Sequence, residues 1–290
     1  MKYLVTGGTG SFGHAFAVRF YGTADIVVLS RDEEKQRAMA LEFPDIEYRI
    51  GDVRELTDVR DAMRFADRVF HAAALKQVPP LEAAPMQAVR TNIIGTDNVC
   101  RAASELWGIP TVVLSTDKAV EPVGVMGATK MLAEAVASSW GYNSVRYGNI
   151  IGSRGSIVPI WRKAIADGEP VRITDPDMSR FVITLDDALD LVDLAMDSPM
   201  DGSVFVKRSP AATVAQLARV IAGDHSTEVI GVRPGEKRHE HLVVPDEHVI
   251  EDGDHFRIRP GLPGTGHRYS SETAPRLTDE ALRDLIEMAS

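Results

Sequence analysis

Cysteine, basic residues and long apolar stretches are all scarce in this chain of 290 residues, and each shortage excludes a class of protein. The single cysteine, Cys100, rules out an internal disulfide, and the apolar helical pattern around it indicates a packing role. Lysine and arginine number 32 against 42 acidic residues, and the formal net charge of −10 argues against nucleic acid as a partner. No apolar run approaches the ~20 residues that span a membrane.

The first residues resemble a strand more than a leader. Met1 and Lys2 lead directly into an apolar run, so we expect no signal peptide and a cytoplasmic protein. Hydrophobic residues make up 44% and charged residues 26%, which is ordinary for a globular protein. The length suits one large domain or two unequal ones.

Short apolar runs alternate with helical patterns through the first half of the chain. The predicted strands are residues 3–5, 26–29, 46–50, 68–74, 111–114 and 143–146. With right-handed crossovers, this alternation predicts an α/β fold of the Rossmann type, a doubly wound parallel sheet.

The composition changes after Gly152, where loops rich in proline and glycine separate short helices and strands. We expect residues 1–152 and about 182–200 to form the cofactor-binding Rossmann domain. Residues 153–181 and 201–290 are expected to form a small substrate-binding lobe over the carboxyl edge of the sheet. Within it, residues 251–271 are rich in glycine, proline and charge and predict loop or partial disorder.

A glycine-rich turn follows the first predicted strand. In residues 6–13, Gly8, Gly10 and Gly13 fit G-x-G-x-x-G, while Gly7, Gly10 and Gly13 fit the wider G-x-x-G-x-x-G spacing. Such glycines allow a tight turn and let a pyrophosphate approach the backbone at a helix N-terminus. The strand–turn–helix context supports dinucleotide binding over a plain loop.

The second strand ends at Ser30-Arg31-Asp32, where NAD-binding proteins place a carboxylate for the ribose 2′-hydroxyl. Here Ser30 takes that position, and the guanidinium of Arg31 suits a 2′-phosphate, so the pattern favours NADP. The alternative is an exposed arginine, with Asp32 serving NAD. After the third strand, Asp52 could accept from the adenine amino group or cap the next helix.

The fourth strand opens into small residues at 72–74, which would let a cofactor pass closely. His71 is expected to be packed rather than catalytic. Lys76 in the following loop could meet phosphate or sugar, or be solvated.

The polar cluster Thr116-Asp117-Lys118 follows the buried fifth strand, and ligands bind at the carboxyl ends of strands in such sheets. Met126 and Lys130 are four residues apart on a predicted helix, so they share one face. Their spacing resembles the Tyr-x-x-x-Lys pair of short-chain dehydrogenases, with methionine in the tyrosine position. The alternative is a surface ion pair and a core methionine.

A nicotinamide cofactor beside an Asp–Lys pair suggests oxidation coupled to proton transfer. In a nucleotide sugar, oxidation at C4 acidifies the C5 proton, a base removes it while an acid protonates the departing C6 hydroxyl, and hydride returns to C6. Lys118 could be the base if burial and Lys130 destabilise its ammonium, and Asp117 could be the acid if held protonated. Arg180 and Arg233 could clamp a diphosphate, or be surface charges.

These motifs together resemble an extended short-chain dehydrogenase/reductase of the UDP-N-acetylglucosamine 4,6-dehydratase type found in capsule and flagellin-glycan synthesis. The matching segments are TGGTGSFG (6–13), SRDEEKQ (30–36), GDVR (51–54), HAAALKQVP (71–79), TN (91–92), STDKAVEP (115–122), GATK (127–130), RYGNIIGSRGS (146–156), TDPDMSRF (174–181) and RPGEK (233–237). Asp-Lys after the fifth strand is the specific element, because related dTDP-glucose dehydratases carry Asp-Glu there and epimerases have no such pair.

The resemblance implies NADP, a UDP-sugar substrate and a homo-oligomer, dimer or hexamer. It implies that Asp117 and Lys118 are acid and base and that Lys130 holds the nicotinamide ribose. The expected catalytic residues are Thr116, Asp117, Lys118, Met126 and Lys130. The expected cofactor-binding residues are Gly7, Gly10, Ser11, Phe12, Gly13, Ser30, Arg31, Asp52, Val53, Ala72, Ala73, Ala74, Lys76, Asn92, Lys130 and Tyr147. The expected substrate-binding residues are Lys76, Asn149, Ser156, Pro159, Arg180, Arg233 and Glu236, and no metal is expected.

Met126 is the main departure from the family pattern, because a thioether cannot accept the C4 hydroxyl proton. Lys118, Thr116 or a water must then do so. The competing interpretations are a nucleotide-sugar C4 epimerase, against which Asp117-Lys118 argues, and a catalytically silent NADP-binding regulator, for which Met126 is the best indication. The sequence leaves open whether C5 is inverted.

Overall fold

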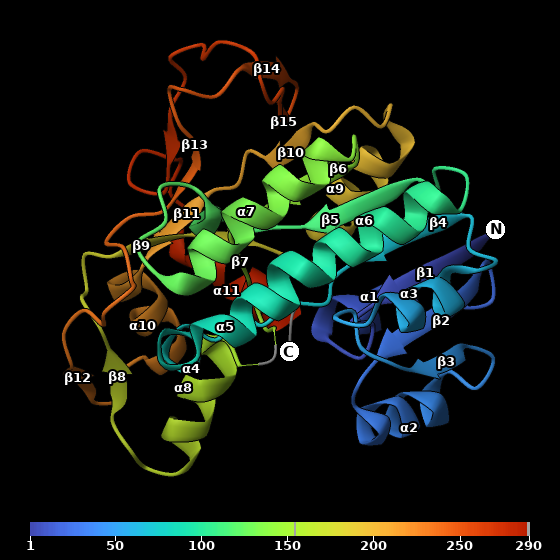
Figure 1. Ribbon diagram of the computed structural model, residues 1–290. Coiled ribbons are helices and arrows are strands. Elements are labelled where there is room, and N and C mark those ends of the chain that lie inside the picture. The colour runs from blue at the N-terminus through green and yellow to red at the C-terminus, as the bar shows by residue number, and fades with distance from the viewer. Residues whose placement is uncertain (154, 289–290) are drawn as a thin grey trace.

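A nine-stranded sheet forms the centre of the computed structural model, which describes residues 1–153 and 155–288 (Figure 1). Its strand order is β14-β15-β10-β6-β5-β4-β1-β2-β3. The strands are β1 Lys2–Thr6, β2 Asp25–Ser30, β3 Glu47–Ile50, β4 Arg68–His71, β5 Thr111–Leu114, β6 Asn143–Arg146, β10 Val204–Lys207, β14 Val249–Asp252 and β15 His255–Ile258. Neighbouring strands in the part of this order from β10 to β3 pair in parallel, whereas β15 is antiparallel to β10 and to β14. The predicted doubly wound α/β fold is therefore confirmed.

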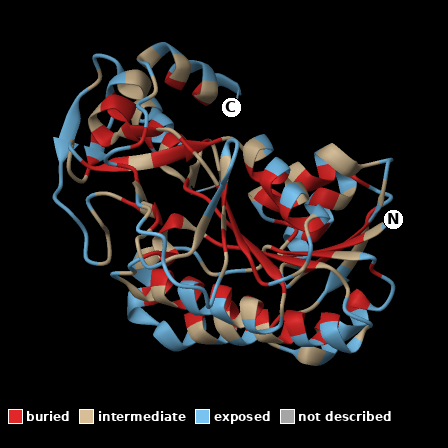
Figure 2. Cartoon of the chain, turned by 90° about the horizontal axis from the view of Figure 1, so that it is seen from above, coloured by how far each residue is buried: buried red, intermediate tan, exposed pale blue. Residues whose placement is uncertain are grey.

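Side chains of each strand alternate between two cores, one on each face of the sheet. Tyr3 and Val5 of β1 enter a core with α1 Ser11–Phe20, α2 Glu33–Glu42 and α9 Leu185–Asp197. Leu4 enters the opposite core, with α3 Leu56–Met63, α6 Gly95–Glu105 and α7 Val125–Ser139. Figure 2 shows the result, buried strands between helices whose outer faces are exposed.

Three short helical segments lie between β4 and α6. They are α4 Val78–Ala83, α5 Pro85–Ala88 and the π-helical turn η1 Val89–Ile94. A 3₁₀ turn, η2 Asp117–Ala119, follows β5 directly. π-turns inside helices often mark functional sites, and η1 contains Asn92.

The C-terminal lobe has its own apolar core beside the carboxyl edge of the sheet. Helices α8 Ile157–Ala166, α10 Val214–Ala222 and α11 Asp279–Met288 pack around Trp161, Leu217 and Leu282. The small strands of the lobe are β7 Asn149–Ile150, β8 Val171–Ile173, β9 Ser179–Ile183, β11 Ala211–Thr213, β12 Thr227–Val229, β13 His241–Val243 and β16 Tyr269–Ser270.

Two findings differ from the sequence expectation. Residues 251–271 are predicted to be loop or partly disordered, but β15 pairs with β10, and β16 pairs with β13. The buried side chains of Phe256 and Ile258 supply the apolar contacts that the composition of this segment conceals. In addition, β10, β14 and β15 come from residues 201–290 and continue the main sheet.

Candidate active site

The glycine turn between β1 and α1 lies close to the backbone that follows β4. Gly7 has φ of +66°, and a Cβ there would lie 2.7 Å from the Cα of Ala73. A Cβ at Gly13 would lie 2.1 Å from the carbonyl oxygen of Gly8, so this glycine lets α1 pack against the turn. No side chain caps α1 at Gly10. A pyrophosphate can therefore approach the N-terminus of α1, as the spacing predicts.

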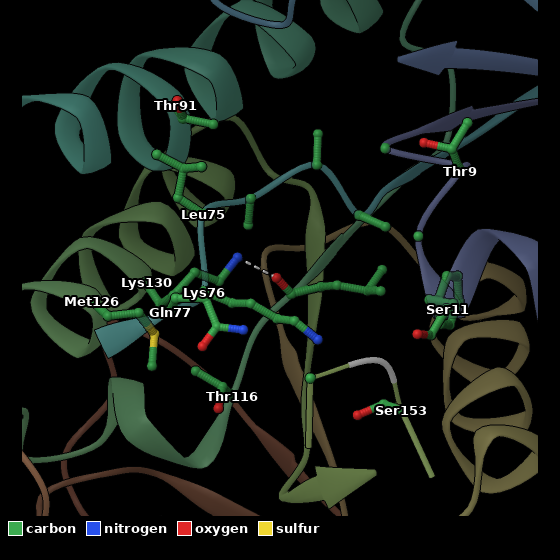
Figure 3. A pocket seen from close by; sticks show the side chains of 18 of the residues that line it. Thr9, Ser11, Leu75, Lys76, Gln77, Thr91, Thr116, Met126, Lys130 and Ser153 are labelled. Carbon is green, nitrogen blue, oxygen red and sulfur yellow. Dashed lines mark hydrogen bonds between the residues drawn. The ribbon is translucent and has the colours of Figure 1, made fainter. Parts of the chain in front are cut away.

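A cavity of about 990 Å³ runs from this turn to the end of β5. In Figure 3, Thr9 and Ser11 lie at one end and Thr116, Met126 and Lys130 at the other. Its lining contains most of the expected cofactor residues, namely Gly7, Gly10, Ser11, Phe12, Ser30, Arg31, Asp52, Val53, Ala72, Ala73, Ala74, Lys76, Lys130 and Tyr147. Its volume and its glycine floor fit a dinucleotide together with part of a substrate.

Two of the expected cofactor residues, Gly13 and Asn92, do not line the cavity. Gly13 serves helix packing, as described above. Asn92 is buried, accepts from the backbone N–H of Leu75 at 2.8 Å and donates to its carbonyl at 3.0 Å. It also donates to Thr129 Oγ1 at 3.0 Å. Asn92 therefore holds the loop that carries Lys76 against α7.

The end of the cavity beside β2 and β3 carries paired charges. Asp52 accepts from Arg54 Nε at 2.8 Å and lies 3.4 Å from Arg31 Nη1. Burial would raise the pKa of Asp52, but bonds from Arg54 outweigh it and the pKa is lowered. Asp32 caps α2 by accepting from the backbone N–H of Lys35 at 3.0 Å. Ser30 Oγ lies 2.9 Å from Thr9 Oγ1.

Lys130 and Met126 lie on the cavity side of α7, as their spacing predicts. The ammonium of Lys130 donates to the carbonyl of Leu114 at 2.5 Å, and burial lowers the pKa of this lysine to about 8. Met126 packs against Leu81 and Ala88. The methionine thus supplies a wall and no proton.

Asp117 and Lys118 lie side by side in η2, directly after β5. Lys118 Nζ is 3.0 Å from Asp117 Oδ1, and Thr116 Oγ1 donates to the same oxygen at 3.0 Å. Thr116 and Lys118 line the cavity, whereas Asp117 is fully buried behind them. Burial raises the pKa of Asp117. This is the direction that an acid needs.

The expectation that the ammonium of Lys118 is destabilised is wrong. Burial does act to lower its pKa, but Asp117 and Glu240 outweigh burial, and the pKa of Lys118 is raised. Lys130 is not among the main causes. Glu240 comes from the loop before β13, with Oε1 3.4 Å from Lys118 Nζ. Sequence reasoning missed Glu240 because nothing in the local pattern shows that it meets η2.

The expected substrate residues fall into two groups. Lys76, Asn149 and Ser156 line the cavity, and Ser156 Oγ is buried with no hydrogen-bond partner in the described part of the chain. Pro159, Arg180, Arg233 and Glu236 are not part of the lining.

Arg180 and Arg233 differ in how they are held. Arg180 Nη1 donates to the carbonyls of Ser179 at 2.8 Å and Arg238 at 3.1 Å. The side chain of Arg233 is 52% exposed and lies 3.7 Å from Glu236.

Other lining residues have no role predicted from the sequence, chiefly Thr9, Leu75, Gln77, Val78, Thr91, Ser115, Ser153 and Gly155. Most of them adjoin predicted site residues in the chain. Arg154, within the segment at 146–156, lies outside the described residues.

The family model described as polysaccharide biosynthesis protein matches residues 3–259. The chain is 43% identical to a UDP-glucose 4-epimerase of Rickettsia bellii over 278 residues, which cover 88% of this chain and 82% of that protein. The X-ray structure of Pen from Bacillus thuringiensis superposes with a TM-score of 0.94 and 34% identity, covering 99% of this chain and 97% of that one. The chain belongs to the extended short-chain dehydrogenase/reductase family of polysaccharide biosynthesis proteins.

Membership makes the chain an enzyme of the nucleotide-sugar-modifying type. A dTDP-glucose 4,6-dehydratase from Streptomyces venezuelae, solved with NAD and TYD, has the same fold at 19% identity and a TM-score of 0.75, with 99% of this chain and 96% of that one covered. Among the described residues, no helix is long and apolar enough to cross a membrane.

Proposed function

We propose that this enzyme is a UDP-N-acetylglucosamine 4,6-dehydratase, a hydro-lyase that keeps NADP bound. The observation that carries the proposal is the Asp117–Lys118 pair, 3.0 Å apart at the end of β5 and beside the cavity. Elimination of water across C5 and C6 requires a base and an acid in addition to the C4 chemistry. This pair supplies two such groups at one strand end.

The 43% identity to a protein named UDP-glucose 4-epimerase favours a second candidate, C4 epimerisation. Epimerisation moves a proton and a hydride at C4 only, so it gives the Asp117–Lys118 pair no task. We therefore favour the dehydratase.

When bound, the nicotinamide supplies hydride chemistry at C4 and C6 of the sugar. Lys118 removes the C5 proton, and it can do so only as the neutral amine. Because its pKa is raised, we expect the C5 step to accelerate as the solution becomes alkaline. A protonated Asp117 would donate to Thr116 Oγ1, which lies 3.0 Å from Asp117 Oδ1 and in the resting site donates to it. Thr116 would then pass its own proton to the departing C6 hydroxyl.

NADP is favoured over NAD by the charges at the end of β2. Asp32 is engaged in capping α2, which leaves it poorly placed to bind a ribose 2′-hydroxyl. Arg31 lines the cavity with a half-exposed side chain. An arginine at this point suits a phosphate.

The substrate diphosphate is proposed to lie between the cavity and the lobe. Asn149 and Ser156 line the cavity, and Ser156 Oγ is a buried hydroxyl without a partner among the described residues. We propose that Arg180, on β9, and Arg233, in a loop of the lobe, bind the diphosphate together with these residues.

Incubation with UDP-N-acetylglucosamine in deuterated water, followed by NMR of the product, tests the proposal. A dehydratase yields a 4-keto-6-deoxy sugar with deuterium at C5. A C4 epimerase yields the 4-epimer with no deuterium at C5, and a silent regulator returns the substrate unchanged. Either of these outcomes removes the proposal.

A further inference from the structure

Glu240 is a buried carboxylate that lies between two lysines. It is 2% exposed, with Oε1 3.4 Å from Lys118 Nζ and Oε2 3.0 Å from Lys237 Nζ. Its backbone N–H donates to Ser271 Oγ at 2.8 Å, which fixes the chain at this point. Lys118 comes from the sheet domain and Lys237 from the lobe, so Glu240 joins the two.

Lys237 makes a second contact between the lobe segment 237–240 and the loop that follows η2. Its ammonium donates to the carbonyl of Val120 at 2.7 Å, just after η2. Gly124 of the same loop lies against Gly235, and a Cβ at Gly124 would be 3.2 Å from the Cα of Gly235. The lobe segment therefore lies directly on the loop that carries Lys118.

The charges alternate along this contact, from Asp117 through Lys118 and Glu240 to Lys237. Burial opposes ionisation of Glu240, but Lys118, Lys237 and Arg180 outweigh it and lower the pKa of Glu240 to about 2. The carboxylate is thus ionised throughout the working range of pH. The titratable and charged groups that face Lys118 are Asp117, Glu240 and Arg180. Those that face Lys237 are Glu240 and His241.

We propose that Glu240 is a positioning residue, which holds the Lys118 ammonium at the cavity wall and sets how readily it gives up its proton, while Lys237 competes for the same carboxylate. The inference rests on the proposed role of Lys118 as the C5 base. It concerns a residue of the lobe that does not line the main cavity.

Two substitutions should act in opposite directions. Glu240→Gln keeps the shape but removes the negative charge, so Lys118 should lose its proton at a lower pH, by on the order of one unit. Lys237→Gln removes the competing cation, so Glu240 should pair more fully with Lys118, which then keeps its proton to a higher pH. If Glu240 had a purely structural role, the pH at which Lys118 loses its proton would change in the same direction in both variants or in neither.

The test measures Lys118 directly in the NADP-bound enzyme, without substrate. Competitive acylation by acetic anhydride at a series of pH values, read by mass spectrometry, gives the titration of each lysine. Lys163, whose side chain is 76% exposed, serves as an internal reference. Glu228→Gln is the control, because Glu228 is also a lobe carboxylate paired with a cation, at 3.1 Å from Arg172 Nε, and lies on β12, which pairs with β8 rather than with the Glu240 loop. It should leave the Lys118 titration unchanged.

The same variants are then assayed for deuterium exchange at C5. The inference and the proposed function are both supported if the pH midpoint of Lys118 acylation moves in opposite directions in the two variants and the pH at which C5 exchange rises moves with it. Opposite shifts in acylation with no dehydration in any protein support the positioning role and sink the proposed function. An unshifted Lys118 titration in Glu240→Gln, or shifts of the same sign in both variants, overturns the inference. If Glu240→Gln does not fold, Lys237→Gln decides the question by itself. The inference is then overturned if Lys118 in Lys237→Gln loses its proton at a lower pH than in the wild type.

Discussion

Burial acts on the adjacent residues Asp117 and Lys118 with different outcomes. Low polarity penalises the charged form of both groups. Lys118 has two carboxylates within reach, at 3.0 Å and 3.4 Å, so its ammonium survives. For Asp117, Lys118 acts to lower the pKa, but burial and the negative charge of Glu240 outweigh it. Burial and Glu240 thus raise the pKa of Asp117, and the two acidic neighbours raise the pKa of Lys118.

Replacing each member of the site separates their roles. Lys118→Ala should lower dehydration and C5 exchange together, by about 10²- to 10⁴-fold, because the base is lost. Asp117→Asn should slow loss of water more than C5 exchange, because an amide cannot deliver the C6 proton. Met126→Ala should retain more activity than either, since a thioether moves no proton. Parallel NMR assays of exchange and product measure all three. Near wild-type dehydration by Lys118→Ala would refute the assignment, and an inactive Met126→Ala would show a role for this wall that proton chemistry does not explain.

We expect Arg31 to determine the choice between NADP and NAD. Arg31→Ala should weaken NADP binding by about ten- to a hundredfold, which corresponds to one charge-assisted contact of about 1.5–3 kcal/mol, and should leave NAD binding within a few fold. Titration calorimetry with both dinucleotides on the cofactor-free enzyme measures this. Arg49→Ala is the control, because Arg49 pairs with Glu47 on β3 and does not line the cavity. Equal losses for NADP and NAD would remove the case for a 2′-phosphate contact.

At the scale of elements, the turn between β1 and α1 and the helix α7 could be predicted from the sequence. Glycine spacing and a four-residue repeat are local signals, and α7 contains Met126 and Lys130, as the spacing predicts. The environment of Lys118 could not be predicted, because Glu240 reaches it only through the packing of the lobe. The strand β15 was missed for a similar reason, since its partner β10 is distant from it in the sequence.

Two glycines with similar backbone angles should behave differently when replaced by alanine. Gly7 and Gly22 have φ of +66° and +76°, but of the two only Gly7 has a neighbour, the backbone of Ala73, within 4 Å of where the alanine Cβ would lie. Gly22→Ala should lower the free energy of unfolding by about 1–2 kcal/mol and leave dinucleotide binding intact. Gly7→Ala should lower it further and abolish binding, because the floor of the cavity must move. Urea unfolding and the fluorescence of bound reduced dinucleotide measure the two effects; equal behaviour of both variants would contradict this role of Gly7.

At the scale of the whole molecule, the lobe is fixed to the sheet by buried charges as well as by apolar packing. Arg146 of β6 donates to Glu134 of α7 at 2.6 Å, to Glu247 at 2.8 Å and to the carbonyl of Leu242 at 2.8 Å. The sequence places Arg146 within a family segment, but its two acidic partners could not be predicted from the local pattern. These contacts keep β13 and the Glu240 loop in register with η2.

Arg146→Met should therefore be one of the most destabilising single changes in the protein. It leaves Glu134, whose side chain is 8% exposed, without its cation, and breaking a buried pair in this way costs about 3–5 kcal/mol. Arg172→Ala is the matched control, because its pair with Glu228 has side chains 67% and 52% exposed and contributes about 0–1 kcal/mol. The double variant Arg146→Met/Glu134→Leu should recover part of the loss, since the uncompensated charge is gone. Urea unfolding of the four proteins measures the series. If Arg146→Met is no less stable than Arg172→Ala, buried charge does not hold the lobe, and the apolar contacts alone carry the attachment on which the Glu240 contact to Lys118 depends.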